Sequence, residues 1–588
     1  MIMSACGGVD SARAPAVAGD TVPRRGGTLR ILGNGDVDHL STSSSSYAPT
    51  YLLFNAFTRQ LVAYPTATTS FEIASHLVPD LAIAVPSTDN GGVSVDGRTY
   101  TFHLRRGVMW NTSPPREVTA HDALRGIKMM CNPVSPYGSP VYYETTITGL
   151  RSYCAAFAKV AGVAADIKHF VDTHEIEGVH APDDTTLVFT LIAPAADFVN
   201  IIAVPFATPV PVEYLDFVPD SPEFRQHTIS HGPYQITKYV ANRELVLERN
   251  PVWNPATDPL RKAWVDRIEV IEGVSAQSVQ QQLEAGTADL SFDQPPPTAD
   301  IARLIGARDP NLMFSPPEDV YGIMWYLAIN FLSPNADAAL RKVKVREALQ
   351  YAVDRAAIVQ LLGGTKVARP LQQLVHSGGV GFIAGYNAYA GSGERGDPAR
   401  ARQLLAEGGF ADGLRLKLLH MTSGTEPMMA QSVQASFARA GITIELLPAT
   451  PTDWMKYIAN PETLKRGVWD LASMQWIPDW FGNNGRAIIG LMLDGRSYGV
   501  NSWDLGAYNS EDANRLIDGA RIATSESEAT ERWTKAAVAI AKDAPIVPLI
   551  ERKHPFYHSA RVQNCFYGVA TNCDVTLLWL GGASANSR

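Results

Sequence analysis

Residues 414–448, LRLKLLHMTSGTEPMMAQSVQASFARAGITIELLP, decide the fold class of this chain. The apolar runs 414–420 and 442–448 are typical of buried strands, and 426–441 between them has the composition of a helix that stops at a glycine. Two strands joined through a helix are expected to lie parallel, with a right-handed crossover. The segment therefore predicts an α/β fold.

The same alternation of strands and helices extends outward from this segment. After residue 320 the sequence predicts strands at 323–330 and 468–476 and helices at 341–362 and 397–410. Before residue 320 it predicts strands at 27–33, 99–110, 185–191, 244–250 and 266–273, and a helix that Thr119 and Asp122 begin as a capping box. The change of character near residue 320 predicts at least two structural units.

Composition limits the classes of function. The 588 residues are 46% hydrophobic, enough for large cores, and the net charge of −9 comes with no basic cluster among aromatic residues. We therefore expect no nucleic-acid partner. No run of 18 apolar residues occurs, so no transmembrane helix is expected.

The first cysteine indicates an exported protein. Cys6 lies in SACGG, which resembles the end of a bacterial lipoprotein signal and is followed by a tether rich in small residues up to residue 26. Only five residues precede Cys6, too few for a complete signal peptide. We expect lipidation at Cys6, an extracytoplasmic protein anchored to the cell membrane, and a signal peptide that is missing or truncated here.

The other four cysteines form two local groups. Four cysteines allow three connectivities, and the grouping favours Cys131 with Cys154 and Cys565 with Cys573. Two disulfides would agree with an oxidising exterior. The alternative is a set of unrelated buried thiols.

Motifs for catalysis and cofactors are not recognisable. The sequence has no H-E-x-x-H, no G-x-x-x-x-G-K-[ST], no G-x-S-x-G and no C-x-x-C. One G-x-G-x-x-G occurs at 391–396, but no apolar strand precedes it, and Asp397 would place a negative charge where phosphate should bind. We expect no enzyme activity, no cofactor and no metal site.

Asp479 is the strongest candidate for a binding residue. It lies in LASMQWIPDW, 471–480, and no lysine or arginine occurs from Trp469 to Gly485. A carboxylate among apolar residues needs a partner, because an unpaired buried charge is costly. The position just after a predicted strand favours a ligand as that partner. The alternatives are a helix cap or an ion pair with Arg486.

Several stretches together resemble one family, the extracytoplasmic solute-binding proteins of ABC importers, in the oligopeptide, dipeptide and nickel-binding group. The resemblance covers about residues 27–585. The stretches that carry it are LVPDLAIAV (77–85), TYTFHLRRGVMWN (99–111), VTAHDALRG (118–126), SHGPYQITKYVANRELVLERNPVW (230–253), LRKVKVREALQYAVDRAAIV (340–359), DPARARQLLAEGGF (397–410) and AKDAPIVPL (541–549).

The resemblance implies a two-lobed α/β fold of the periplasmic-binding-protein type that encloses its ligand between the lobes. Lobe one would be 27–56, 206–327 and 550–588, with a small domain inserted at 57–205. Lobe two would be 328–549. Residues 1–26 would be the signal remnant and tether. The hinges would lie near 326–329 and 547–550.

The resemblance also implies the ligand-binding residues. In peptide-binding members an aspartate shortly after a tryptophan holds the α-ammonium of the ligand, and Asp479 and Trp476 match those positions. Tyr137, in NPVSPYGSP, would approach the same end of the ligand, and Trp480 is a further expected ligand contact. The main chain of Ser473, Met474 and Gln475, and that from Tyr326 to Asn330, would pair with an extended peptide as added strands.

The implied function is that of a monomeric lipoprotein that captures peptides, with oligopeptides favoured over shorter ones. It would deliver them to the permease and ATPase subunits of an ABC importer. Members that prefer short peptides carry an arginine on the strand before the tryptophan, and the matching positions here are Ser473 and Met474. A different solute on the same fold, such as an oligosaccharide, a metal chelate or a signalling peptide, is the alternative.

Overall fold

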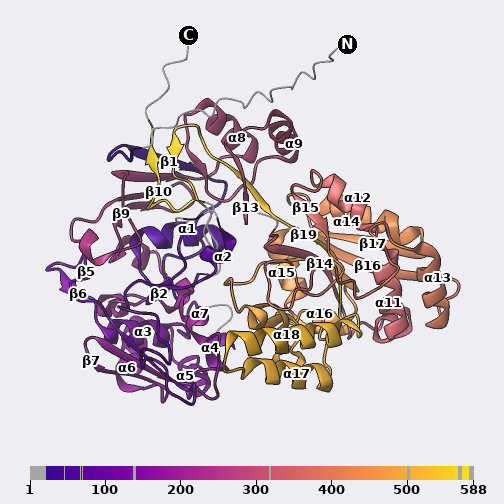
Figure 1. Ribbon diagram of the computed structural model, residues 1–588, viewed down its shortest axis with the longest axis horizontal. Helices are drawn as coiled ribbons and strands as arrows, with labels where there is room; N and C mark the ends of the chain where they lie inside the picture. The colour runs from indigo at the N-terminus through magenta and orange to yellow at the C-terminus, as the bar shows by residue number, and fades with distance from the viewer. Residues whose placement is uncertain are drawn as a thin grey trace, which may run out of the picture.

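Two α/β lobes lie side by side, and a smaller domain packs below the first of them (Figure 1). This computed structural model describes residues 22–581 except 46, 67, 69, 137–140, 317–319, 500–502 and 567–572. The first lobe and the small domain come mainly from the first half of the chain, and the second lobe from a later, continuous segment (Figure 1).

The first lobe is built on a five-stranded sheet. In spatial order its strands are β12 (Leu290–Ser291), β1 (Thr28–Leu32), β11 (Arg267–Ile271), β10 (Glu244–Arg249) and β9 (Tyr234–Val240). β1 is parallel to both of its neighbours, and its Leu29 and Ile31 are fully buried. The helices of this lobe are α1 (Ala48–Phe57), α8 (Ala276–Ala285) and α9 (Thr298–Ala307).

The small domain leaves the first lobe after α1 and returns near residue 205. Its sheet consists of β4 (Thr99–His103), β8 (Thr186–Thr190) and β7 (Val179–Asp183), with the strand pairs β2 (Val62–Ala63) with β3 (Val78–Pro79) and β5 (Met109–Trp110) with β6 (Arg116–Glu117) beside it. Its helices are α2 (Phe71–Ala74), α3 (Ala120–Met129), α4 (Val141–Glu144), α5 (Leu150–Phe157), α6 (Ala164–Thr173) and α7 (Phe198–Ile202). The predicted capping box at Thr119 and Asp122 is present at the start of α3.

A buried ion cluster joins the small domain to the first lobe. Asp80 accepts hydrogen bonds from Arg59 Nε at 2.8 Å and from Arg261 Nη2 at 3.0 Å, and all three side chains are at most 2% exposed. Because Arg261 belongs to the first lobe and Asp80 to the inserted segment, this cluster fixes one to the other.

The second lobe is built on a six-stranded sheet. In spatial order its strands are β15 (Ala368–Pro370), β19 (Ile546–Arg552), β14 (Ile323–Ile329), β18 (Leu471–Trp476), β16 (Leu414–Met421) and β17 (Ile442–Ala449). β16 and β17 are parallel and are joined through α14 (Glu426–Ala438), as residues 414–448 predict.

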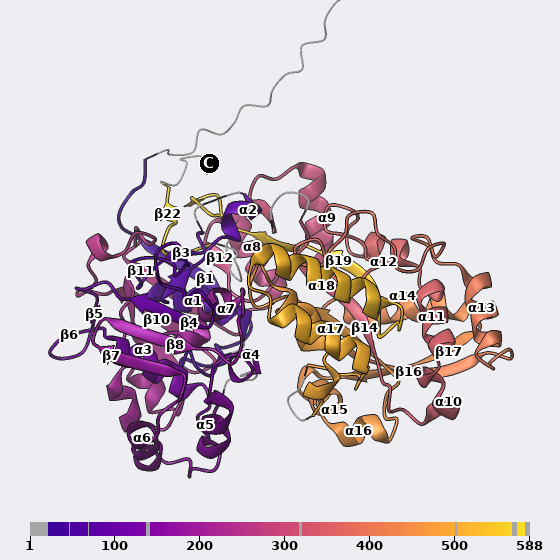
Figure 2. The same ribbon diagram turned by 60° about the horizontal axis from the view of Figure 1, so that its bottom comes forward.

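Helices cover both faces of this sheet. Alternate residues of β14, such as Trp325 and Leu327, pack on one face with α11 (Val343–Ala352), α12 (Arg355–Leu361) and α14. The residues between them, such as Tyr326, pack on the other face with the layer that contains α17 (Glu511–Arg521) and α18 (Glu526–Ala541), which lies toward the viewer in Figure 2. The remaining helices are α10 (Asn335–Ala338), α13 (Pro398–Glu407), α15 (Pro451–Ile458) and α16 (Pro461–Lys465).

Two predicted elements are interrupted. The helix predicted at 341–362 is two helices, because the Asp354 side chain caps α12 by accepting from Ala357 N, and Arg355 turns inward to bond the carbonyls of Leu371 and Pro548. The strand predicted at 99–110 is likewise two short strands, β4 and β5.

The crossings between the lobes lie outside the segments predicted as hinges. Residues 326–329 and 547–550 are paired with each other inside the six-stranded sheet, so the predicted boundaries at 327/328 and 549/550 would cut through β14 and β19. The chain instead changes lobe between β13 (Leu312–Ser315) and β14, and between β19 and β20 (His554–Tyr557). β13 and β20 pair with each other, and His558, directly after β20, bridges to Leu290 of β12 in the first lobe.

Both cysteine pairs that the sequence favours are disulfides. Cys131–Cys154 joins the residues after α3 to α5, with a Cα–Cα distance of 5.1 Å, and Cys565–Cys573 closes a short loop near β21 (Val562–Gln563) and β22 (Trp579–Leu580) with a distance of 4.8 Å. Cys6 lies outside the described residues.

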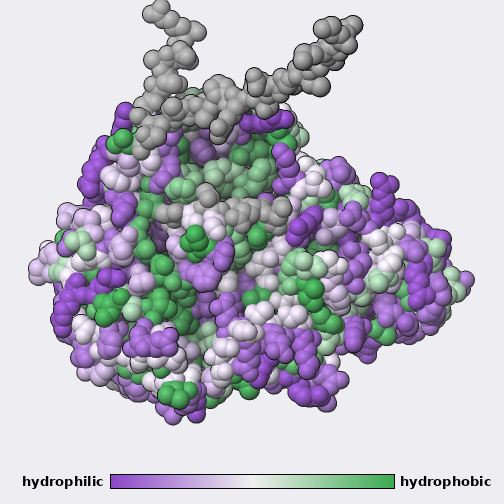
Figure 3. Space-filling view, viewed as in Figure 1, coloured by the Kyte–Doolittle hydropathy of each residue, from purple (hydrophilic) through white to green (hydrophobic). Residues whose placement is uncertain are grey.

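The surface agrees with a water-facing exterior. The outer edge of the second lobe is mostly hydrophilic, and hydrophobic side chains show more over the first lobe and the small domain (Figure 3). Among the described residues, no helix has both the length and the apolar character that a membrane crossing requires.

Candidate functional site

Asp479 lies between the lobes, three residues beyond the end of β18. Its side chain is half-buried and lines a cavity of about 60 Å³. The other lining residues all come from the first lobe and the inserted segment: Tyr51, Asn55, Gln60, Ala63, Tyr64, Thr66, Ala203, Val204 and Pro205. The carboxylate of the second lobe thus enters a chamber built by the other half of the molecule.

Asp479 accepts one hydrogen bond from the described residues. The Tyr142 hydroxyl, from α4 of the small domain, donates to Asp479 Oδ2 at 2.6 Å. Among the described residues no lysine, arginine or histidine forms an ion pair with this carboxylate. Burial raises the pKa of the Asp479 carboxyl to about 6, although the hydrogen bond from Tyr142 lowers it. The site therefore favours the arrival of a cation.

Arg486, the alternative partner of Asp479, bonds elsewhere. Its Nε and Nη2 donate to the two oxygens of Asp197 at 2.7 and 3.0 Å, and the side chains of this pair are about 5% exposed. Its Nη1 donates to Thr146 at 3.2 Å. Because Asp197 and Thr146 lie in the small domain, Arg486 links the second lobe to it and leaves Asp479 without a cation.

The two tryptophans that flank Asp479 are structural supports. Trp476 is 7% exposed and its Nε1 donates to Ala487 O at 2.9 Å. Trp480 is fully buried, its Nε1 donates to Asn483 O at 3.2 Å, and its ring meets the Tyr142 ring edge-on at 5.0 Å. In this structure both indoles therefore contact the protein itself, and their contact with a ligand stays a prediction.

One edge of β18 is open where an added strand was expected. β14 pairs with β18 along its whole length, whereas β16 pairs with it at Leu471 and Ala472 alone within the described residues. The main chain of residues 473–475 thus keeps one edge without a strand partner in that part of the chain. Behind it, Ser473 and Gln475 both bond the buried carboxylate of Glu426, at 2.6 and 3.1 Å.

The corresponding expectation for residues 326–330 is wrong. β14 is a central strand, paired with β18 on one side and β19 on the other, so the main chain from Tyr326 to Ile329 has no free edge for a ligand. Asn330 is fully buried, and its side-chain amide donates to the carbonyls of Leu464 and Trp469 at 3.0 and 2.8 Å. Its role is to hold the loop before β18.

Tyr137, expected to approach the ligand beside Asp479, lies outside the described residues. Among the described residues, Tyr142 is the tyrosine that bonds Asp479, and the sequence analysis missed it. The available signal was a tyrosine pair in VYYE, immediately after the SPYGSP segment.

A metal centre finds little support among the described residues. The one group of three possible ligands within that part of the chain is Cys131, Glu144 and Cys154, whose atoms lie within 4.8 Å of one another. Its two sulfur atoms are joined in a disulfide, which removes the thiolates that a metal would need.

The molecule has two lobes joined by two crossings, and an unneutralised carboxylate faces a chamber between the lobes. This arrangement defines a ligand-enclosing binding protein. The family model described as bacterial extracellular solute-binding proteins, family 5 Middle, matches residues 76–488. The chain belongs to this family of extracellular solute-binding proteins.

Relatives cover most of the chain. The periplasmic oligopeptide-binding protein OppA of Salmonella typhimurium is 25% identical over 496 residues, 82% of this chain and 80% of that protein. The dipeptide-binding protein of Escherichia coli is 27% identical over 529 residues, 86% of this chain and 85% of that protein. The solved structure of clavulanic acid biosynthesis oligopeptide binding protein 2 is 25% identical, with a TM-score of 0.82 over 95% of this chain and 96% of that chain.

Proposed function

We propose that this protein captures peptides outside the cell and delivers them to the permease and ATPase subunits of an ABC importer. The relatives above are named for oligopeptides and dipeptides, which supports a peptide as the solute. The observation that carries the proposal is Asp479, a desolvated carboxylate between the lobes with a tyrosine, rather than a cation, as its partner.

The α-ammonium of a peptide is the cation that this site would receive. A charge-assisted hydrogen bond is about twice as strong as a neutral one. The open edge of residues 473–475 would then pair with the main chain of the same extended peptide, which gives affinity with little demand on side chains. Together the two contacts fix one end and the direction of the ligand.

An oligosaccharide fits the site less well. A neutral sugar brings no cation for Asp479, and sugar rings stack on open aromatic faces, whereas Trp480 is fully buried and Trp476 is 7% exposed. The buried indoles therefore favour the peptide over the sugar.

We further propose that the protein is a monomer held at the outer face of the membrane by a lipid on Cys6, a residue beyond the described part of the chain. Expression with a complete lipoprotein signal should place the wild type, but not a Cys6→Ala variant, in the membrane fraction. Equal membrane partitioning of both would rule out the anchor.

The function is tested by native mass spectrometry of the purified protein, which should show a ladder of co-purified peptide masses. Calorimetry with one peptide in free-amino and N-acetylated forms should then give tight binding for the first and weak binding for the second. Equal affinities for the two forms would contradict the role of Asp479, and no binding of any peptide from a mixed library would contradict the proposed function.

A further inference from the structure

The hydrogen bond between Tyr142 and Asp479 joins the two halves of the molecule. Tyr142 belongs to α4 of the small domain, and Asp479 to the second lobe. Tyr142 is 1% exposed, and its ring is held edge-on against Trp480. The contact therefore exists only when the lobes are together, and it uses one of the two carboxylate oxygens.

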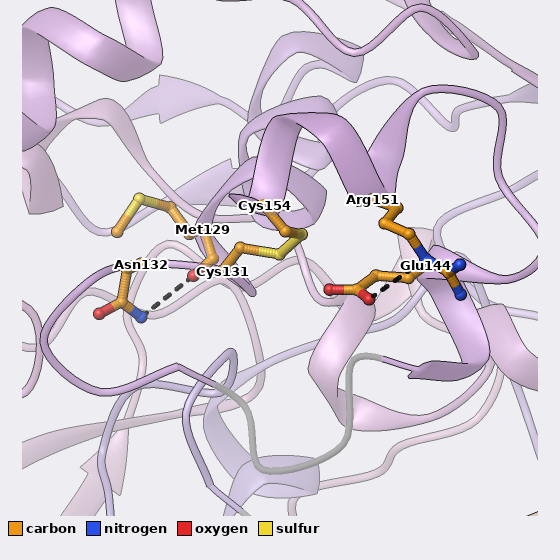
Figure 4. Close-up of a disulfide and its surroundings, with 6 residues drawn as sticks. All are labelled: Met129, Cys131, Asn132, Glu144, Arg151 and Cys154. Carbon is orange, nitrogen blue, oxygen red and sulfur yellow. Dashed lines mark hydrogen bonds and ion pairs between the residues drawn. A yellow bond between two sulfur atoms is a disulfide. The ribbon is translucent and has the colours of Figure 1, made fainter. Parts of the chain in front are cut away.

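The helix that carries Tyr142 is held by contacts within the small domain. The next residue, Tyr143, is fully buried and donates its hydroxyl to Ile201 O at 2.9 Å. At the end of α4, the Glu144 carboxylate lies within 4.8 Å of the sulfur atoms of Cys131 and Cys154, with Arg151 on its other side (Figure 4). The small domain thus holds the short helix from which Tyr142 reaches the second lobe.

The two carboxylate oxygens of Asp479 consequently differ. Oδ2 accepts from Tyr142, while Oδ1 has no hydrogen-bond partner among the described residues, and the side chain faces the cavity of about 60 Å³. A planar guanidinium binds a carboxylate best through two parallel hydrogen bonds, one to each oxygen, whereas an ammonium binds as a compact point charge through one.

Building on the proposed peptide function, we propose that Tyr142 is a positioning residue that determines which cation the site selects. By donating to Oδ2, its hydroxyl fills part of the hydrogen-bonding capacity of that oxygen, so a guanidinium that bonds both oxygens would have to share Oδ2 with Tyr142, whereas an ammonium can bind at Oδ1 alone. The closed site therefore takes an ammonium in preference to a guanidinium. The same hydrogen bond favours the ionised carboxylate, against the effect of burial. Tyr142 thereby favours the ionised form of Asp479 and leaves Oδ1 as its more available oxygen.

The test compares two cations on one peptide. The probes are a peptide with a free α-ammonium, the same peptide amidinated at its amino terminus to carry a guanidinium, and the N-acetylated form as a neutral control of similar size. Dissociation constants are measured by calorimetry with wild type, Tyr142→Phe and Tyr143→Phe. Tyr143→Phe is the matched control, because it removes a buried hydroxyl from the same helix that bonds a carbonyl instead of Asp479.

The wild type and Tyr143→Phe should bind the ammonium peptide about tenfold or more tightly than the guanidinium peptide, a ratio that corresponds to about one charge-assisted hydrogen bond. In Tyr142→Phe, where both oxygens are free, this ratio should fall to about threefold or less. Tyr142→Phe retains the ring that packs on Trp480, so its melting temperature should stay near that of the wild type.

A pH profile separates positioning from a structural role. Affinity for the ammonium peptide should rise with pH as Asp479 ionises, with a midpoint near 6 in the wild type. The groups that face it are Tyr142, which donates a hydrogen bond, and the neutral hydroxyls of Tyr51 and Tyr143, whose pKa values the charge of Asp479 helps to raise. Arg486 is held by Asp197. Removing the Tyr142 hydroxyl should move the midpoint to higher pH, and Tyr143→Phe should leave it in place.

The outcomes are distinct. An unchanged cation ratio in Tyr142→Phe, or a midpoint that does not move, would overturn the inference while leaving peptide binding intact. A wild type that binds neither cationic peptide would instead overturn the proposed function.

Discussion

Asp80 accepts hydrogen bonds from two guanidinium groups, whereas Asp479 accepts one from a tyrosine hydroxyl. Burial by itself would raise the pKa of both carboxyls. Arg261 and Arg59 reverse that effect and lower the pKa of Asp80 to about 2, while the pKa of Asp479 stays raised, at about 6. The first carboxylate is neutralised by its own chain and stabilises the fold. The second is left for a partner from outside.

The comparison predicts the largest effect at Asp80. An Asp80→Asn variant leaves Arg59 and Arg261 buried with less negative charge, and breaking a buried pair in this way costs about 3–5 kcal/mol. Urea denaturation at pH 7 should show that loss of unfolding free energy. Because the folded pKa of Asp80 is lowered, its contribution should be present above the unfolded pKa near 4 and be lost as the pH falls toward 2. A loss of unfolding free energy below about 1 kcal/mol would mean that Asp80 does not stabilise the fold in the way that distinguishes it from Asp479.

Asp479→Asn should have a nearly equal effect, but on ligand affinity. Without the charge, affinity for a free-amino peptide should fall by about two to three orders of magnitude, and affinity for the N-acetylated peptide should change little. Calorimetry on the four combinations of protein and peptide measures the coupling. Asp518→Asn, at a carboxylate that is 53% exposed in the same lobe, is the control. If the affinity lost through Asp479→Asn and the affinity lost through N-acetylation simply add, the carboxylate does not contact the ammonium.

The two Asp→Asn substitutions should change the free energy of unfolding in different directions at pH 7. The folded pKa of Asp479 is raised, so its ionisation in the closed, unliganded protein is destabilising and that penalty grows as the pH rises from about 4 to about 6. Asp479→Asn should therefore be at least as stable as the wild type at pH 7 and no more stable than it at pH 4. Thermal unfolding at the two pH values checks this, and a destabilised Asp479→Asn at pH 7 would show that the carboxylate is structural.

Arg486 and Asp197 provide an intermediate case, a buried pair whose two members come from opposite halves of the molecule. Arg486→Met should weaken peptide affinity by about tenfold, since closure then buries an unpaired Asp197, and the radius of gyration of the unliganded protein should increase. The double variant Arg486→Met, Asp197→Leu should recover part of the peptide affinity and part of the compactness of the unliganded protein. Scattering profiles that match those of the wild type would show that the pair does not contribute to closure.

The sequence predicted the strand–helix–strand segment, most strands and the position of Asp479 just beyond a strand, because these depend on local patterns of apolar residues and caps. It did not predict that Asp354 would end one helix and begin another, since the decisive contacts of Arg355 are with Leu371 and Pro548, far along the chain. Similarly, an apolar strand such as 323–330 has the same pattern at the edge of a sheet as at its centre.

The site was predictable in its central residue but not in its partners. Asp479 is marked by the lack of nearby basic residues in the sequence. Tyr142 is 337 residues away along the chain, and the pairing of Arg486 with Asp197 spans 289 residues, so neither could be read from local spacing. Both depend on how the small domain is placed against the second lobe.

The crossings between the lobes have a consequence for the order in which the protein is made. The second lobe is one continuous segment, from β14 to β19, and all six strands of its sheet are available once β19 has been synthesised. The five-stranded sheet of the first lobe needs no strand beyond β12, but the pair of β13 and β20 needs β20, because Ser315 pairs with His554, on the far side of the second lobe in the sequence. During export, therefore, the first lobe lacks the β13–β20 pair until the last stretch of the chain has emerged. The second lobe emerges later but has all the strands of its sheet as soon as β19 is out. A folding helper that acts on this protein would meet an incomplete first lobe beside a finished second one.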